Sequence, residues 1–229
     1  MLLLILKIIG WIVLVILGFF VFVQTIVRLV KHFIHRPSPA FVPYLINNPI
    51  RRKFLPPERV IDHMDIREGM RVLEVGPGTG FYTFEAARRA ESSGYVYALD
   101  IEPKAIARLK GEIEQRKAKN ITARVASAYE IPLPSNSVDR ASMVGVLAEI
   151  PDKQKALCEI RRVLKREGVL VLAECLIDPD YPFRKTEIGW CRDAGFELMG
   201  SYGSAFFYVL TFKLAEGAIY KDKIFLNEN

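Results

Sequence analysis

The sequence predicts a doubly wound α/β domain with a mainly parallel sheet, preceded by one N-terminal transmembrane helix. From residue 60 onward, short apolar runs alternate with amphipathic stretches of helical spacing, which is typical of parallel strands covered by helices. The last two apolar runs follow each other too closely for a parallel crossover, so they predict an antiparallel hairpin. Residues 8–27 carry no charge and are long enough to cross a bilayer core, which needs about 20 apolar residues in a helix.

The apolar N-terminal run is followed by basic residues. It is longer than the apolar part of a cleaved signal peptide, and no small-residue cleavage site follows it. Positive charge is denser on its C-terminal side, from Arg28 to Arg36. The positive-inside rule then predicts a single-pass membrane protein whose remaining residues lie in the cytoplasm.

The net charge of +6 is unevenly distributed along the 229 residues. Residues 28–59 carry a net charge of +6, whereas residues 60–229 carry −1. The main domain therefore gives no sign of nucleic-acid binding, and the basic segment is placed to contact an anionic membrane surface. Cys158, Cys175 and Cys191 stand far apart, which argues against disulfides or a structural zinc and indicates a reducing compartment.

Three segments follow from these patterns: an anchor with its basic flank at 1–35, a proline-rich basic collar at 36–59, and the α/β domain at 60–229. The collar holds six prolines, so it cannot form one long helix. It is either a simple linker or a segment that lies on the membrane surface and lines the entrance to a site.

Within the domain, strands are expected at 71–75, 95–99, 121–126, 138–144 and 169–173. Helices are expected at 79–90, 103–117, 152–165 and 185–194, the second of them opened by a proline in its first turn. The closing hairpin is expected to pair residues 196–202 with 206–212.

The main chemical motif is Glu74-Val-Gly76-Pro-Gly78-Thr-Gly80, between the first strand and the first helix. Its glycines allow a tight turn and a close approach of a ligand to the backbone. The dinucleotide fingerprint requires a further glycine at position 81, where this chain has Phe81. The motif therefore indicates a nucleotide-type ligand but argues against NAD.

Asp100 closes the second predicted strand, 20 residues after Gly80. A carboxylate in that position accepts hydrogen bonds from both hydroxyls of a ribose. The alternative is that it only caps the next helix. The spacing from the glycines favours the ribose role.

Four ordered motifs, EVGPGTG, ALDIEPKAI, ASAYEIPLPSNSVDRASMV and EIRRVLKREGVLVLAE, resemble those of class I S-adenosylmethionine-dependent methyltransferases. The resemblance covers about residues 55–213 and is greatest to the ubiquinone/menaquinone-biosynthesis type enzymes. It implies a Rossmann-like seven-stranded sheet with an antiparallel last strand, and S-adenosylmethionine as cofactor.

The resemblance also implies roles for nine residues. Glu74, Gly76, Gly78 and Gly80 would contact the methionine part of the cofactor, and Asp100 the ribose. Around the adenine and the sulfonium, the expected residues are Ile101, Ser127, Ala128 and Val144. Ser127 departs from the pattern, because relatives often have an aspartate there that contacts the adenine amino group.

No acid–base constellation stands out, so no catalytic residue is assigned. The polar side chains that could reach the site are His63, Glu149, Asp178, Tyr181 and Tyr202. Displacement at a sulfonium needs mainly positioning and desolvation, because the leaving group is already good.

The favoured function is membrane-anchored methylation of a hydrophobic or lipid-linked small molecule. The membrane position supports this acceptor class, because a tethered enzyme meets membrane-dissolved molecules at high effective concentration. The alternatives are a non-catalytic S-adenosylmethionine-binding scaffold at the membrane, and an NAD-dependent oxidoreductase on a similar sheet.

Overall fold

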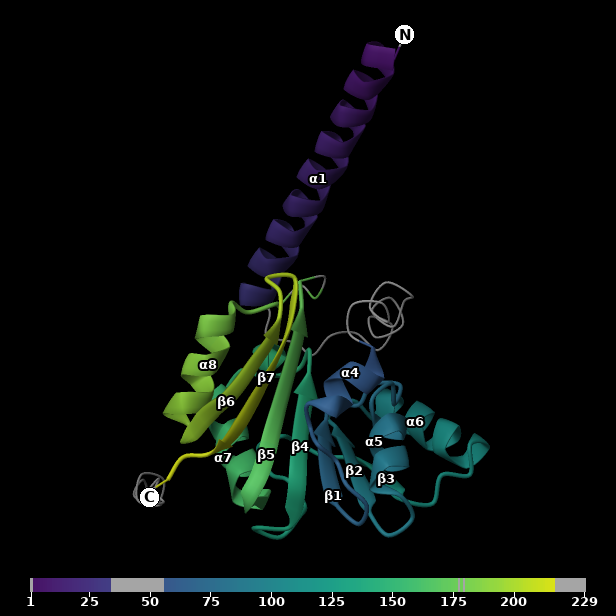
Figure 1. Cartoon of the computed structure of the whole chain (residues 1–229), viewed down its shortest axis with the longest axis vertical. Helices are drawn as coiled ribbons and strands as arrows, with labels where there is room; N and C mark the ends of the chain where they lie inside the picture. The colour runs from purple at the N-terminus through teal and green to yellow at the C-terminus, as the bar shows by residue number, and fades with distance from the viewer. Residues whose placement is uncertain (1, 34–55, 177, 179, 217–229) are drawn as a thin grey trace. The chain divides into compact units, whose positions relative to one another are not determined.

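The computed structural model describes residues 2–33, 56–176, 178 and 180–216 (Figure 1). The chain divides into two compact units, residues 1–37 and residues 38–229. Most of the predicted collar, residues 36–55, lies outside the described residues.

The described residues of the first unit form helix α1 (Leu2–Phe33). Its described side chains include many exposed apolar ones, among them Trp11 and Phe19. The expected helix is thus present, but its predicted membrane-spanning character is not supported. Within the described part of the chain, no helix combines the length and the apolar character that a bilayer crossing requires.

The second unit is built on a seven-stranded sheet in the order β3-β2-β1-β4-β5-β7-β6. Only β7 runs antiparallel to its neighbours, β5 and β6, so the predicted sheet and its closing hairpin are confirmed. The strands are β1 (Arg71–Val75), β2 (Tyr95–Asp100), β3 (Ile121–Val125), β4 (Val138–Val144), β5 (Leu164–Cys175), β6 (Phe196–Gly203) and β7 (Phe207–Leu214).

Helices cover both faces of the sheet, which explains why the central strands are buried on both sides (Figure 1). One face packs against α7 (Lys153–Val163) and α8 (Arg184–Asp193). The other face packs against α4 (Pro57–Asp62), α5 (Thr83–Ala90) and α6 (Pro103–Gln115). A short 3-10 helix, η1 (Leu147–Glu149), follows β4.

The largest differences from the predicted boundaries are at the starts of α5 and β5. Helix α5 begins at Thr83 rather than near residue 79, because the glycine-rich turn continues up to the start of the helix. Strand β5 begins at Leu164 rather than 169, since Leu164 already pairs with Val138 before a register shift interrupts the ladder. Such a bulge leaves extra residues on one strand and is not visible as an apolar run.

Candidate cofactor site

The candidate site lies at the carboxyl edge of the parallel strands. Chain order reverses between β1 and β4, because β2 and β3 lie on one side of β1 while β4 and β5 lie on the other. In open α/β sheets, ligands bind outside the carboxyl ends of the strands at such a reversal. The glycine-rich turn leaves β1 at this point.

The turn holds its three glycines in the left-handed region, with φ of +75° at Gly76, +55° at Gly78 and +84° at Gly80. Two backbone hydrogen bonds fix it: the Gly76 amide donates to the Leu99 carbonyl and the Gly80 amide to the Pro77 carbonyl, both at 2.8 Å. A side chain at these φ values is strained, so glycine is required by the backbone itself.

Space imposes a second requirement on two of these glycines. A Cβ on Gly76 would lie 2.3 Å from a Val146 methyl group. A Cβ on Gly80 would lie 2.6 Å from Leu109 and 2.8 Å from Phe84. Val146 was not predicted as part of the site. Its only sequence signal is an apolar residue after a glycine at the end of β4, and that signal is weak.

Glu74 is buried on β1, where Thr83 at the start of α5 donates a 2.6 Å hydrogen bond to its carboxylate. Burial raises the pKa of Glu74 to about 7, the hydrogen bond from Thr83 opposes that change, and the charge of Asp100 adds to it. The two predicted acids lie near the same edge, because β1 and β2 are adjacent parallel strands. Thr83 was missed, since a threonine at a helix start is ordinary in sequence.

Asp100 ends β2 and is partly buried. Its carboxylate accepts a 2.9 Å hydrogen bond from the Glu102 amide, and Glu102 is the residue that caps α6 by accepting from Lys104. The capping role considered for Asp100 therefore belongs to Glu102. Burial raises the pKa of Asp100, while backbone donors from Glu102, Gly78 and Ile101 act in the opposite direction. The carboxylate thus sits directly against the glycine-rich turn.

The remaining predicted residues follow β2, β3 and β4. Ile101 is 57% exposed just beyond Asp100, which leaves its side chain open to a flat ligand. Ser127 and Ala128 are half-buried, and the Ser127 hydroxyl accepts a hydrogen bond from the Tyr129 amide at 3.1 Å. Val144 is buried at the end of β4.

The five side chains considered for acid–base work fall into separate groups. The rings of His63 and Tyr202 stack, with centroids 4.0 Å apart and an angle of 17° between their planes. Burial lowers the pKa of His63, and the charge of Asp62 opposes this change. The backbone carbonyl of Asp178 accepts from the Tyr181 amide in the loop after β5, and Glu149 is exposed on η1.

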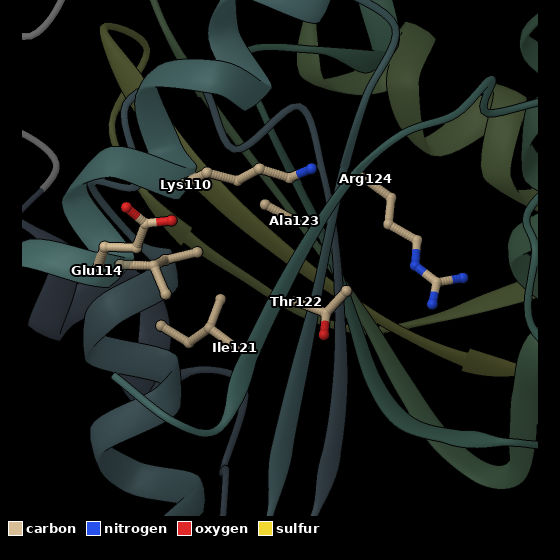
Figure 2. Close-up of a pocket in the computed structure, with 7 residues that line it drawn as sticks. Lys110, Glu114, Ile121, Thr122, Ala123 and Arg124 are labelled. Atoms are coloured by element: carbon tan, nitrogen blue, oxygen red, sulfur yellow. The ribbon is translucent and has the colours of Figure 1, made fainter. Parts of the chain in front are cut away.

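A pocket of about 310 Å³ lies elsewhere, between α6 and the edge strand β3 (Figure 2). Lys110 and Glu114 line it from α6, and Ile121 and Ala123 line it from β3. It shares no residue with the predicted cofactor set. We place the site at the glycine-rich turn because the backbone geometry, the two acids and the strand-order reversal coincide there.

The comparisons with known proteins identify the family of this domain. Residues 66–193 match the family model described as "Methyltransferase domain", which is more than half of the chain and includes all nine predicted site residues. The chain belongs to this family. The resemblance found in the four sequence motifs is thereby confirmed, and S-adenosylmethionine is the cofactor that membership implies.

Curated relatives of this methyltransferase domain include demethylmenaquinone methyltransferase of Staphylococcus aureus (strain MRSA252), 32% identical over 51% of this chain and 48% of the relative. Another is 2-methyl-6-phytyl-1,4-hydroquinone methyltransferase of Arabidopsis thaliana, 32% identical over 56% of this chain and 40% of the relative. The chain thus spans about half the length, or less, of the curated relatives it matches.

Solved structures share the fold at lower identity. A SAM-dependent methyltransferase from Aquifex aeolicus has a TM-score of 0.72 and 24% identity, covering 78% of this chain and all of that one. The [4+2]-cyclase SpnF has a TM-score of 0.63 and 18% identity, covering 69% of this chain and 79% of that one. These likenesses establish the fold alone, and the second names a chemistry other than methyl transfer.

The residues at the turn fit S-adenosylmethionine. The cofactor needs bare backbone beside its amino-acid part, and the turn presents three glycines, Gly76, Gly78 and Gly80, at the carboxyl edge of β1. Its ribose needs an acceptor for two hydroxyls, and Asp100 offers a half-buried carboxylate at the end of β2. The buried Glu74 adds a second carboxyl group beneath the turn.

Proposed function

We propose that this methyltransferase domain transfers a methyl group from S-adenosylmethionine to a hydrophobic, quinone-type small molecule at a membrane. The single observation that carries the donor assignment is the pairing of the positive-φ turn at Gly76–Gly80 with Asp100 on the adjacent strand. Both lie at the reversal of strand order, where the fold binds its ligands.

Each part of the site has a distinct task in this proposal. The glycine-rich turn binds the amino-acid part of the cofactor through its backbone, and Asp100 accepts from the ribose hydroxyls. Val144 and Val146 exclude water from the reacting centre. When bound, S-adenosylmethionine supplies an electrophilic methyl group on a sulfonium. The protein contributes mainly position and desolvation, which suit a displacement with a good leaving group.

The acceptor class rests on two supports. The names of the relatives specify menaquinone-type and phytylated hydroquinone acceptors. In addition, one row of the sheet is apolar from Val144 outward: Val144 pairs with Ala173, Ala173 with Val209, and Val209 with Tyr202. Register partners share a face, so this row leads from the end of β4 to the aromatic stack of Tyr202 on His63.

We further propose that the chain works at the cytoplasmic surface of a membrane. Helix α1 exposes apolar side chains, including Trp11 and Phe19, that a lipid surface would cover. The sequence adds a basic segment at residues 28–59, which an anionic leaflet attracts. The three cysteines are free thiols, in keeping with a reducing compartment. Fractionation of cells, followed by salt and detergent extraction, tests this location.

Calorimetry with S-adenosylmethionine tests the donor site. Asp100→Ala removes hydrogen bonds to a charged acceptor, worth about 1.5–3 kcal/mol, so the affinity is expected to fall about tenfold or more. Glu102→Ala is the matched control, because this neighbouring acid caps α6 and lies outside the predicted cofactor set. Equal affinity in the parent and the Asp100 variant would contradict the proposed site.

Labelled S-adenosylmethionine tests the reaction. After incubation with a prenylated quinol in detergent or vesicles, the label is expected in the lipid-soluble product. Label found only on protein or RNA would overturn the acceptor class. Binding without any transfer would favour the scaffold alternative. The arguments for that alternative are Ser127 and the absence of a paired acid and base among the described site residues. The oxidoreductase alternative is not supported, since the family is that of methyltransferases.

A further inference from the structure

Two phenylalanines are exposed together at the carboxyl edge of the sheet. Phe183 lies just before α8 and is 76% exposed, and Phe206 lies in the turn between β6 and β7 and is 66% exposed. Large aromatic side chains with this degree of exposure forgo the favourable free energy of burial, and neighbouring ones commonly mark an interaction surface. We call these two residues and the loops that carry them, 181–185 and 203–206, the aromatic tip.

The two loops are tied to one another by side-chain hydrogen bonds. The Tyr181 hydroxyl donates to the Ala205 carbonyl at 2.6 Å, and the Arg184 guanidinium donates to the Ser204 carbonyl at 2.7 Å. The Phe206 carbonyl also accepts from the Leu176 amide at 2.7 Å, just after β5. These bonds hold both phenylalanines outward on a fixed base, rather than leaving them to fold back on the domain.

The tip lies on the same edge of the sheet as the cofactor site. Phe207 begins β7 and pairs with Cys175, the last residue of β5. Strands β1, β4 and β5 run parallel, so the end of β5 lies at the edge where the glycine-rich turn leaves β1. A molecule entering at the tip therefore arrives on the side of the domain where the methyl donor is proposed to bind.

The charge at the tip is complementary to an anionic surface. Lys185 is exposed directly after Phe183 and Arg184, while the carboxylate of Asp178 nearby is buried and Asp180 is partly buried. Aromatic rings flanked by Lys and Arg are the composition found where proteins meet the headgroup region of a bilayer. An apolar protein partner could pack against the two rings equally well, but the ammonium group of Lys185 would not strengthen that contact.

We propose that the aromatic tip inserts Phe183 and Phe206 into an anionic bilayer, and so presents the active edge of the domain to acceptors dissolved in the membrane. This inference rests on the proposed function, because it assumes a membrane-dissolved acceptor. It adds a second membrane contact, on the catalytic domain itself, to the one proposed for α1.

Quenching by lipid-borne bromine tests the proposal on the full chain. Phe206→Trp places a fluorophore at the tip, and Met199→Trp is the matched control. Met199 is 57% exposed on the same hairpin, about 13 Å farther from the tip at about 3.3 Å per residue. The emission of Trp11 and Trp190 is measured in the parent chain and subtracted.

In vesicles of equal parts phosphatidylcholine and phosphatidylglycerol with brominated acyl chains, the fluorophore at position 206 is expected to be quenched at least about threefold more than that at position 199. Equal quenching at both positions, or quenching at neither, would overturn the proposal. Cross-linking of two chains through position 206, with no quenching there, would also overturn the proposal, because it would show that the tip contacts a second copy of the chain. S-adenosylmethionine binding is measured on the same vesicles, so that a failed donor site is distinguished from a failed membrane contact.

Discussion

At the scale of single residues, backbone conformation and space specify the glycines of the site more strictly than chemistry does. Gly80 combines a φ of +84° with neighbours that leave no room for a methyl group, since Leu109 and Phe84 lie within 3 Å of the Cβ position. Gly111 on α6 is the opposite case, because nothing lies within 4 Å of its Cβ position. The same substitution should therefore have opposite effects at these two glycines.

Gly80→Ala is expected to lower the free energy of unfolding by about 1–3 kcal/mol, through the strained φ and the overpacking. Gly111→Ala should raise it by about 0.5–1 kcal/mol, because alanine favours the helix interior. Urea unfolding of both variants measures the difference. Similar changes in both would show that the turn relaxes more easily than its contacts indicate.

At the scale of elements, α8 buries a carboxyl group against the sheet. Glu187 is fully buried beside Glu174 of β5 and Tyr208 of β7, and burial raises its pKa above the ordinary 4.5. The folded chain therefore holds this proton more tightly than the unfolded chain does. The resulting contribution to stability is complete below pH 4.5 and is lost as the pH rises through the raised pKa.

Glu187→Gln removes the titration while keeping the volume of the side chain. As the pH rises from 5 to 8, the free energy of unfolding is expected to fall by about 1–3 kcal/mol less in the variant than in the parent. A tenfold difference in proton affinity between the folded and unfolded chains corresponds to about 1.4 kcal/mol. Urea unfolding at a series of pH values measures this. Glu197→Gln on β6 is the control, because its exposed ion pair with Lys213 contributes little. An unchanged pH slope in the Glu187 variant would refute the account.

The elements also show what sequence can and cannot predict. Strand β1 was predicted residue for residue, because Arg71–Val75 is a short apolar run closed by glycine. The other strands of the sheet were also predicted from short apolar runs. The antiparallel direction of β7 was predicted from the short gap between the last two runs. The start of α5, the bulge in β5 and the contact of Val146 with Gly76 depend on tertiary pairing, which a single sequence does not display.

At the scale of the whole molecule, we expect the chain to separate membrane attachment from methyl-donor binding. The two compact units are residues 1–37 and 38–229, and all nine predicted cofactor residues belong to the second. Attachment through α1 should therefore be removable without loss of donor binding, while the aromatic tip of the second unit keeps a weaker contact with the membrane.

Deletion of residues 1–37 is expected to weaken binding to anionic vesicles while leaving the affinity for S-adenosylmethionine within about twofold, because the deleted residues form a separate unit. Vesicle sedimentation and calorimetry on the same preparation measure the two properties. Loss of cofactor affinity in a variant that remains folded by circular dichroism would show that the units depend on each other.

The reversed direction of β7 has a consequence for how such an enzyme can diversify. Strand β7 lies between β5 and β6 and runs antiparallel to both. The turn at residues 204–206 therefore lies at the same edge of the sheet as the glycine-rich turn, but it is not connected to β1 or β2. Insertions in that turn can change which acceptors the enzyme binds, while the half of the sheet proposed to bind the adenosyl group stays constant.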